Sequence, residues 1–297
     1  MFVPLRLIAS SLVVLLCLSQ CQKQDWKVNQ KEANQETHVA SLPQSPLNNG
    51  DGFWVIAHRG VSGSYPENTL SAFQAAIDIR AEMVELDVSI SQDGIPVVVH
   101  DRTVDRTTDF EGDVQSFSVE ELKRMEVGAW FSEEFRGEEF PTLRESLELM
   151  KGQIAVNIEI KTEAVSDEIQ GGVVDKALQI VKDLDMISSV IFSSFDYRVM
   201  EQLNVLDSKI AKALLYEASQ SAELLPSELV QKYKIDIFNC SYKQLSEEWI
   251  NDLQKHEIPY FVYTVNEPEL MRELIEKDVS GIFTDFPQEL IEIVENM

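Results

Sequence analysis

Side chains able to bind a metal ion or move a proton recur at short spacings in this chain of 297 residues. Acidic and apolar residues alternate in Glu-Leu-Asp at 85–87 and in Asn-Ile-Glu-Ile-Lys at 157–161. Because successive side chains of a strand point to opposite faces, each alternation collects its polar side chains on one face. An all-oxygen cluster of carboxylates is the donor set that hard divalent cations prefer. We therefore expect Glu85, Asp87 and Glu159 to hold a divalent cation, Ca²⁺ or Mg²⁺.

Two histidines and two cations accompany these carboxylates. His58 and His100 end apolar runs, and imidazole has the unperturbed pKa nearest to neutrality, so the pair is suited to general acid/base catalysis. Arg59 and Lys161 are expected to contact a phosphate group. A salt bridge to a neighbouring Lys or Arg is the alternative role for any single carboxylate. Zinc is the competing metal, but several hard oxygens without a cysteine suit it less well.

The rest of the pattern indicates how such residues are brought together. From residue 53 onward, short β-branched runs alternate with amphipathic helical patterns, which is typical of parallel strands joined by crossover helices. Eight such units predict an α/β fold, a closed (β/α)8 TIM barrel whose active site lies at the C-terminal ends of its strands. A doubly wound open sheet is the alternative. The predicted strands are Phe53–His58, Met83–Asp87, Ile154–Ile160, Val190–Phe195, Ile210–Tyr216, Ile235–Cys240, Pro259–Val265 and Gly281–Thr284.

A ninth apolar run, Ile95–His100, is separated from the second strand pattern by little more than Gln-Asp-Gly at 92–94. A parallel crossover needs a dozen or more residues, whereas Asp-Gly between alternating apolar residues favours a β-hairpin. We therefore expect this run to return antiparallel and to bring His100 to the level of Asp87. Residues from about 102 to 140 then form a short insertion after the second barrel strand.

The N-terminal segment has the features of an export signal. One basic residue, Arg6, precedes an apolar run from Leu7 to Leu18 that is too short to span a bilayer comfortably. The Leu-Ser-Gln-Cys at 18–21 resembles a bacterial lipobox, although Gln stands where Gly or Ala is usual. The resemblance implies a lipoprotein-type signal peptide over 1–21 and an exported protein, anchored in the membrane through lipidated Cys21 on the periplasmic or extracellular side. An unlipidated secretory signal or a simple N-terminal anchor is the alternative.

Residues 22–52 are rich in Gln, Asn, Ser and Lys without aliphatic periodicity, and we expect a flexible tether there. The barrel is expected to occupy 53–297, where Cys240 is the one cysteine, so no intrachain disulfide is expected.

Lys and Arg number 25 against 51 Asp and Glu, a net charge of -26 with no basic cluster. This balance excludes nucleic acid as a partner, and it requires a metal ion or local cations at any phosphate site. The sequence does not indicate the oligomeric state.

Taken together, these motifs resemble those of the glycerophosphodiester phosphodiesterases. The resemblance covers residues 53–292 and implies a (β/α)8 barrel that hydrolyses glycerophosphodiesters to glycerol 3-phosphate and an alcohol. It also implies that His58 and His100 act as general base and acid, that Glu85, Asp87 and Glu159 are metal ligands, and that Arg59 and Lys161 contact the phosphate. The motifs are His-Arg-Gly at 58–60, Pro-Glu-Asn-Thr at 66–69, Glu-Leu-Asp-Val at 85–88, Asp-Gly at 93–94, Val-Val-Val-His-Asp at 97–101, Asn-Ile-Glu-Ile-Lys at 157–161, Thr-Val-Asn at 264–266, and Gly-Ile-Phe-Thr-Asp at 281–285 with Pro287.

Other residues are expected around the substrate. Glu67 is expected near the site, beside Asn68, which is an N-cap candidate for the first helix. Phe195 and Tyr263, at the ends of predicted strands, are expected to form walls of the substrate pocket; the family often has Trp where Tyr263 stands. The aromatic pair Trp-Phe at 130–131 either lines the leaving-group side of the pocket or packs the insertion onto the barrel.

Two other functions fit parts of the pattern. A phospholipase D-like enzyme acting on lysolipids or sphingolipids would use a similar set of histidines and carboxylates. The cysteines that hold the catalytic loop of the sphingomyelinase D-like enzymes are absent near His100, which argues against this reading. A non-catalytic, surface-tethered binding barrel is the other alternative, but it would not need the complete set of site residues.

Overall fold

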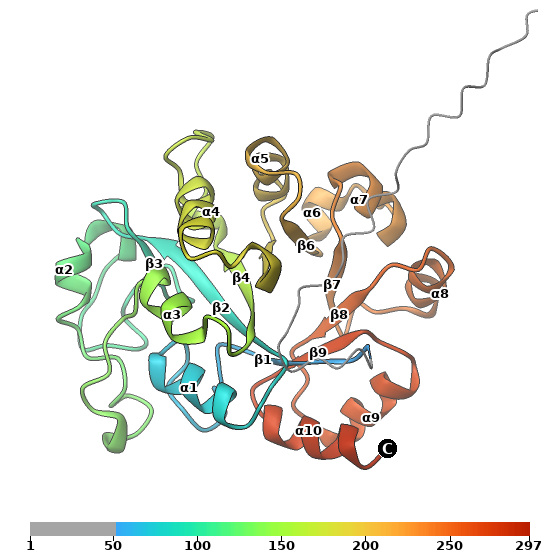
Figure 1. The fold of residues 1–297 in the computed structure, drawn as a ribbon, viewed down its shortest axis with the longest axis horizontal. Helices are drawn as coiled ribbons and strands as arrows, with labels where there is room; N and C mark the ends of the chain where they lie inside the picture. The colour runs from blue at the N-terminus through green and yellow to red at the C-terminus, as the bar shows by residue number, and fades with distance from the viewer. Residues whose placement is uncertain (1–51) are drawn as a thin grey trace, which may run out of the picture. The chain divides into compact units, whose positions relative to one another are not determined.

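The computed structural model describes residues 52–297 and shows the predicted α/β barrel (Figure 1). Eight parallel strands are hydrogen-bonded in the order β1-β9-β8-β7-β6-β5-β4-β2, and β1 also pairs with β2, which closes the sheet. The predicted signal segment, Cys21 and nearly all of the predicted tether lie outside the described residues. The strands are β1 (Trp54–Ala57), β2 (Met83–Ile90), β4 (Ala155–Ile160), β5 (Val190–Ser194), β6 (Ala211–Leu215), β7 (Ile237–Ser241), β8 (Tyr260–Tyr263) and β9 (Gly281–Thr284).

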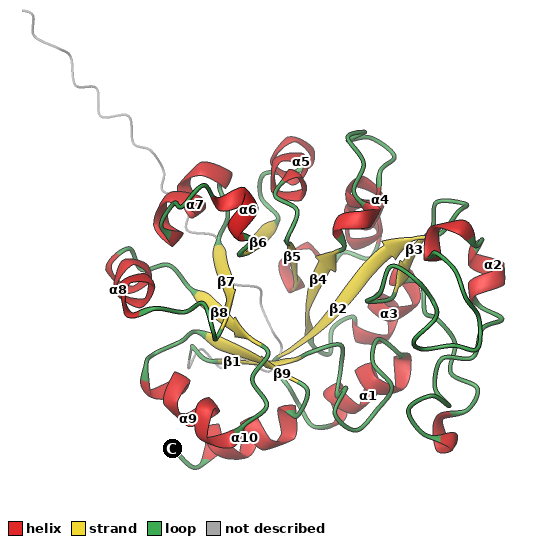
Figure 2. Ribbon diagram, turned by 180° about the vertical axis from the view of Figure 1, so that it is seen from behind, coloured by secondary structure: helices red, strands yellow, loops and turns green. Residues whose placement is uncertain are grey.

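Helices surround these strands in both ribbon views (Figures 1 and 2). Side-chain caps start several of them: Thr69 accepts a hydrogen bond from the backbone N–H of Ala72 at α1, and Thr142 and Glu145 form a reciprocal capping box at α3. Among residues 52–297, no helix is long and apolar enough to cross a membrane. The α-helices are α1 (Leu70–Asp78), α2 (Val119–Leu122), α3 (Leu143–Met150), α4 (Val173–Asp183), α5 (Arg198–Leu206), α6 (Ala218–Ser221), α7 (Pro226–Tyr233), α8 (Glu247–Lys255), α9 (Pro268–Glu276) and α10 (Pro287–Glu295), and 3-10 turns lie at Val114–Ser116, Glu133–Phe135, Thr162–Ala164 and Ile187–Ser189.

The hairpin forms where the Asp-Gly pattern predicts it. β2 runs on past the predicted strand end, and β3 (Pro96–Val98) pairs with it antiparallel. Gly94 in the turn has a φ of +78°, a left-handed conformation that glycine adopts without steric cost. The backbone N–H of Val99 donates to the carbonyl oxygen of Asp87 at 2.9 Å. The next residue, His100, is thereby returned to the level of Asp87, which confirms the prediction.

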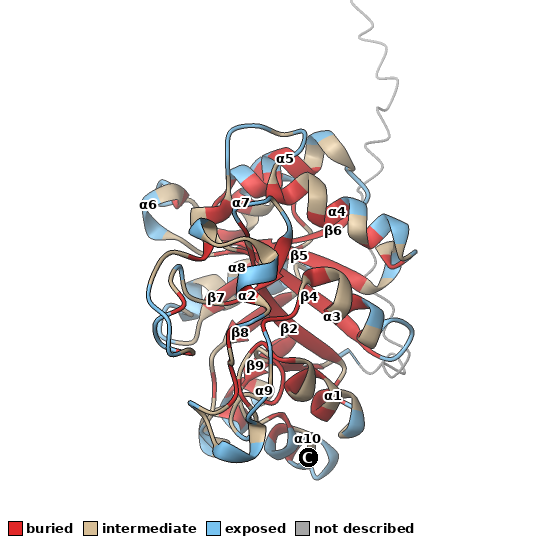
Figure 3. Cartoon of the chain, turned by 90° about the vertical axis from the view of Figure 1, so that its left-hand side faces the viewer, coloured by how far each residue is buried: buried red, intermediate tan, exposed pale blue. Residues whose placement is uncertain are grey.

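Apolar side chains fill the interior of the barrel up to the predicted site. Trp54, Met83, Phe261 and Phe283 belong to a buried cluster inside the barrel. A larger cluster lies between the outward faces of the strands and the helices, and Figure 3 shows the strands as the most buried part of the described chain. Each fully buried apolar side chain of this kind stabilises the fold by about 1.5–3 kcal/mol relative to exposure. The two clusters give the C-terminal ends of the strands a rigid support.

The insertion between β3 and α3 has a small core of its own. The indole N–H of Trp130 donates to the carbonyl oxygen of Val127 at 2.7 Å, and Phe131 packs edge-on against Trp130 with ring centroids 5.8 Å apart. Phe131 also packs edge-on against Phe135 at 5.8 Å, and the Phe135 ring meets that of Tyr65, between β1 and α1, at 5.3 Å. Of the two predicted roles for this aromatic pair, these contacts support packing of the insertion onto the barrel. The buried core of the insertion and hairpin consists of Val97, Val99, Val104, Val114, Leu122, Met125, Val127 and Phe140.

Candidate active site

A cavity of about 150 Å³ lies at the C-terminal ends of the barrel strands. Eight of the ten site residues that the sequence predicts in the described region line this cavity. Of the other two, Asp87 lies beside it in contact with Lys161, whereas Glu67 lines a small neighbouring cavity together with His100. The eight lining residues are His58, Arg59, Glu85, His100, Glu159, Lys161, Phe195 and Tyr263.

The three predicted metal ligands form a compact carboxylate cluster. β2 contributes Glu85 and Asp87, and Glu159 on neighbouring β4 lies opposite Asp87 in the parallel register. One ligand oxygen from each carboxylate lies within 4.8 Å of the others. Burial, together with repulsion from Asp87 and Glu159, raises the pKa of the Glu85 carboxyl well above its usual value. Two buried carboxylates and one half-buried carboxylate held this close are a donor set that fits a hard divalent cation.

Lys161 and Arg59 partly balance this negative charge. The Lys161 Nζ lies 2.8 Å from Oε1 of Glu159 and 3.1 Å from Oδ1 of Asp87. Burial alone would raise the pKa of Asp87, but Lys161 and Arg59 overcome that effect and hold it well below its usual value. Three carboxyl groups face two cations here, so when all three are ionised the cluster carries a negative charge that a bound cation would offset. The salt bridge considered as an alternative for a single carboxylate thus occurs within the cluster rather than in place of it.

The turn between β1 and α1 positions Arg59. Its φ is +56°, and Gly60 follows at +83°, where a β-carbon would lie 2.7 Å from backbone atoms of Ala72. Glycine is therefore required at this position for both conformation and space. The turn directs the backbone N–H of Arg59 to Oε2 of Glu85 at 2.8 Å and its guanidinium Nη1 to Oε1 of Glu67 at 2.9 Å.

His58 follows β1 and is held by an aspartate at the end of β9. Its Nδ1 lies 2.6 Å from Oδ1 of Asp285, which also accepts hydrogen bonds from Ser62 Oγ at 2.9 Å and, through Oδ2, from Asn266 Nδ2 at 2.7 Å. Burial opposes ionisation of Asp285, but the hydrogen bonds from His58, Asn266 and Ser62 lower its pKa to about 2. Because Nδ1 is occupied, Nε2 is the ring nitrogen left for proton transfer.

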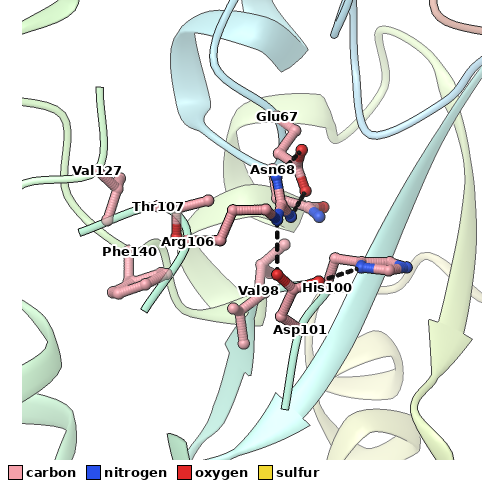
Figure 4. Close-up of a pocket in the computed structure, with 10 residues that line it drawn as sticks. Glu67, Asn68, Val98, His100, Asp101, Arg106, Thr107, Val127 and Phe140 are labelled. Atoms are coloured by element: carbon pink, nitrogen blue, oxygen red, sulfur yellow. Dashed lines mark hydrogen bonds and ion pairs between the residues drawn. The ribbon is translucent and has the colours of Figure 1, made fainter. Parts of the chain in front are cut away.

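His100 is held in a similar way, but the support comes from the insertion. Its Nδ1 lies 2.7 Å from Oδ1 of Asp101, and Oδ2 of Asp101 accepts a hydrogen bond from Arg106 Nε at 2.6 Å. Arg106 in turn binds both carboxylate oxygens of Glu67, as Figure 4 shows. The Glu67 carboxylate is therefore occupied by Arg106 and Arg59, and its predicted contact with substrate stays a prediction.

One sequence expectation is wrong. Asn68 is not the N-cap of α1; Thr69 is, with the extended backbone typical of that position. Asn68 has a φ of +58° and turns its side chain to β2, where Nδ2 donates to Oδ2 of Asp87 at 2.8 Å and Oδ1 accepts the Asp87 backbone N–H at 3.2 Å. It therefore orients one of the predicted metal ligands.

Aromatic side chains form one wall of the cavity. The rings of Phe195 and Tyr263 meet edge to face with centroids 5.9 Å apart, and Tyr263 packs in the same way on Phe283 at 6.2 Å. Burial raises the pKa of the Tyr263 hydroxyl, so it stays protonated at neutral pH. Both predicted wall residues thus line the cavity; their contact with a substrate remains a prediction.

Sequence reasoning missed the groups that hold the histidines. Asp101 and Asp285 lie within quoted motifs, and their positions directly after His100 and at a strand end were the available signals. Arg106 offered no such signal, because its partner Glu67 lies 39 residues away in the chain. Such a pairing depends on side-chain geometry that no local pattern contains.

A (β/α)8 barrel with paired histidines, a carboxylate cluster and cations at its mouth has the groups that hydrolysis of a phosphate ester requires. The chain belongs to the glycerophosphoryl diester phosphodiesterase family, whose model matches residues 58–289. It is therefore an enzyme, a phosphoric diester hydrolase.

Individual relatives cover nearly the whole barrel. A glycerophosphodiester phosphodiesterase of Caldanaerobacter subterraneus subsp. tengcongensis is 36% identical over 241 residues, which cover 81% of this chain and 97% of the relative. An Oleispira antarctica phosphodiesterase, solved in complex with the product sn-glycerol-3-phosphate, has a TM-score of 0.74 and 28% identity over 81% of this chain and 96% of its own. A glycerophosphodiester phosphodiesterase from Agrobacterium tumefaciens has a TM-score of 0.69 and 27% identity over 79% and 97%. These likenesses confirm the predicted fold.

Proposed function

We propose that this enzyme hydrolyses glycerophosphodiesters to glycerol 3-phosphate and an alcohol in a reaction that depends on a divalent cation. The observation that carries the proposal is the presence, around one cavity, of two aspartate-held histidines and a cluster of three carboxylates. The product bound to the Oleispira enzyme and the activity named for the Caldanaerobacter relative support the choice of substrate.

Glu85, Asp87 and Glu159 would hold the cation, Ca²⁺ or Mg²⁺. When bound, it would supply positive charge to the phosphoryl group and lower the pKa of an oxygen nucleophile. Arg59 and Lys161 would contact the phosphate oxygens and help the site to bind an anion in a chain of net charge -26.

Each of the two histidines carries out one of the two proton transfers. One of His58 and His100 removes a proton from the attacking oxygen, and the other donates a proton to the leaving alcohol. Asp285 and Asp101 fix the two Nδ1 atoms, so each ring presents Nε2 for its transfer. Two nucleophiles are compatible with this arrangement: water, or the substrate's own glycerol hydroxyl by way of a cyclic phosphate.

We also propose that the enzyme works at a membrane surface on the exported side. The proposal rests on Cys21, which follows an apolar run and precedes a polar segment over 22–52. A lipidated Cys21 would carry several acyl chains, and more than one chain is needed for stable anchoring. A segment of this length would let the barrel reach glycerophosphodiesters released by lipid turnover.

Removal of the metal tests the catalytic proposal. EDTA should abolish hydrolysis of glycerophosphocholine by the purified protein, and added Ca²⁺ or Mg²⁺ should restore it. Glu159→Gln should weaken cation affinity by about 10-fold or more, since it removes one charged ligand. Glu168→Gln, an exposed carboxylate shortly after the same strand, is the matched control and should bind the cation like the wild type. Full activity in EDTA, with no divalent ion found by elemental analysis, would refute the metal dependence.

A further inference from the structure

Arg106, at the start of the insertion, joins two carboxylates beside the active site. Its Nη1 and Nη2 donate to Oε2 and Oε1 of Glu67 at 2.8 and 2.7 Å, and its Nε donates to Oδ2 of Asp101 at 2.6 Å (Figure 4). The ring of Trp130 covers the guanidinium at 5.5 Å. A planar guanidinium with donors in a fixed fork is the side chain best suited to set the orientation of two carboxylates at once.

The contacts continue from Arg106 to a proposed catalytic group. The second oxygen of Asp101 faces Nδ1 of His100 at 2.7 Å, and His100 lines the cavity. Glu67, whose side chain is 13% exposed, serves as the anchor because it is also bound by Arg59. Asp101 is 30% exposed and, apart from His100, Arg106 is the group that holds it in the described residues.

We propose that Arg106 is a positioning residue that acts through Asp101 to hold His100 in its working orientation. Without Arg106, the partly exposed Asp101 carboxylate can turn toward solvent, and the His100 ring loses the partner that fixes its Nδ1. A displacement of about 1 Å at a proton-transferring group is enough to slow catalysis strongly. The inference rests on the proposed function, since it assigns a support to one of the two proposed acid/base groups.

The insertion does not depend on Arg106 for its fold. It has its own buried core, and its C-terminal end is tied to the hairpin by the hydrogen bond from the Val98 N–H to the Pro141 carbonyl oxygen at 2.9 Å. A guanidinium half open to solvent adds little stability as an ion pair. A role in orienting Asp101 therefore explains the three close contacts better than a role in holding the insertion.

The first test compares two arginines of the insertion. Arg106→Gln should lower kcat for glycerophosphocholine by about 10-fold or more, with the thermal unfolding midpoint close to that of the wild type. Arg102→Gln is the matched control: Arg102 also pairs with an aspartate, Asp113 at 2.7 Å, but its side chain is 71% exposed and its partner contacts no site residue. The control should keep the wild-type kcat. Equal activity of the two variants would overturn the inference.

The second test separates positioning from a structural effect. If Arg106 acts through His100, then Arg106→Gln in a His100→Ala background should lower kcat by less than about 2-fold further, because groups that act as a unit are non-additive. A full additional loss in that background would overturn the inference. Asp101→Asn should reproduce the loss of Arg106→Gln and carries the test if Arg106→Gln fails to fold. An inactive wild type would contradict the proposed function and the inference with it, whereas an active wild type with an unimpaired Arg106→Gln contradicts the inference alone.

Discussion

Each histidine at the site is fixed through Nδ1 by an aspartate, but the two aspartates differ in what holds them. Asp285 is fixed within the barrel, by Ser62 and Asn266 on either side of it. Asp101 depends on a side chain of the insertion. The orientation of His58 therefore depends on residues of the barrel alone. The orientation of His100 depends on a residue of the insertion as well.

Replacement of Asp285 tests the first of these supports. Asp285→Asn keeps the shape of the side chain but replaces the carboxylate that lies 2.6 Å from the His58 Nδ1 by a neutral amide. We expect kcat to fall by about 10-fold or more, with a smaller change in KM, because the effect is on proton transfer rather than on binding. Steady-state kinetics on glycerophosphocholine measure this. A kcat within 2-fold of the wild type would show that His58 needs no partner.

The same variant has a predicted pH signature. The folded pKa of Asp285 is about 2, below its usual 3.8, so the ionised carboxylate stabilises the fold. A lowered pKa contributes stability that is present above about pH 4 and is lost as the pH falls through the folded value. The difference in free energy of unfolding between wild type and Asp285→Asn should therefore shrink from pH 4 to pH 2, as measured by urea denaturation. A difference that stays constant over this range would contradict the assignment.

At the scale of the elements, the turn after β1 carries both His58 and Arg59. Gly60 ends this turn against the backbone of Ala72. Gly60→Ala should lower the free energy of unfolding by about 2 kcal/mol or more, since a β-carbon adds a clash to the strain of a positive φ. It should also lower kcat, because the turn must shift.

Gly152→Ala is the matched control for this substitution. Gly152 has a φ of +72°, close to that of Gly60, but no atom lies within 4 Å of its β-carbon position. Gly152→Ala should lower the free energy of unfolding by about 1 kcal/mol and retain activity. Chemical denaturation of both variants separates the cost of the positive φ from the cost of the clash. Equal losses in the free energy of unfolding would show that the structure accommodates a β-carbon at residue 60 without further cost.

Elements were easier to predict than contacts. The strands and the hairpin follow from the alternation of apolar and polar residues and from one Asp-Gly turn. Both are local patterns, set by residues close together in the chain. The prediction of the N-cap at Asn68 was wrong because two adjacent residues, Asn68 and Thr69, both have side chains that can cap a helix. The contact of Asn68 with Asp87 on β2 decides between them. The link from Glu67 to Arg106 was missed for the same reason, since it exists only once the insertion packs on the barrel.

At the scale of the whole molecule, charge bears on how the enzyme would reach a membrane. A chain with net charge -26 is repelled by anionic lipid head groups, so electrostatic adsorption cannot hold it there. Anchoring through acyl chains on Cys21 does not depend on charge. The membrane proposal therefore predicts attachment that salt does not disturb.

Fractionation of cells that express the full chain tests this. The wild type should sediment with membranes and resist a high-salt wash, whereas Cys21→Ser should appear in the soluble exported fraction. Mass spectrometry should find the mature N-terminus at Cys21 with a lipid mass. Equal partitioning of both proteins, or an unmodified N-terminus elsewhere, would mean that the lipoprotein proposal fails.

The identity of the product tests the proposed reaction most directly. Purified enzyme with Ca²⁺ or Mg²⁺ is incubated with glycerophosphocholine, and in parallel with lysophosphatidylcholine, and glycerol 3-phosphate and choline are quantified. We predict equal amounts of glycerol 3-phosphate and choline from the first substrate, little turnover of the second, and a kcat at least about 100-fold lower for His58→Ala and for His100→Ala. Three results would contradict the proposed reaction: release of phosphocholine instead, preference for the lysolipid, or full activity of either histidine variant.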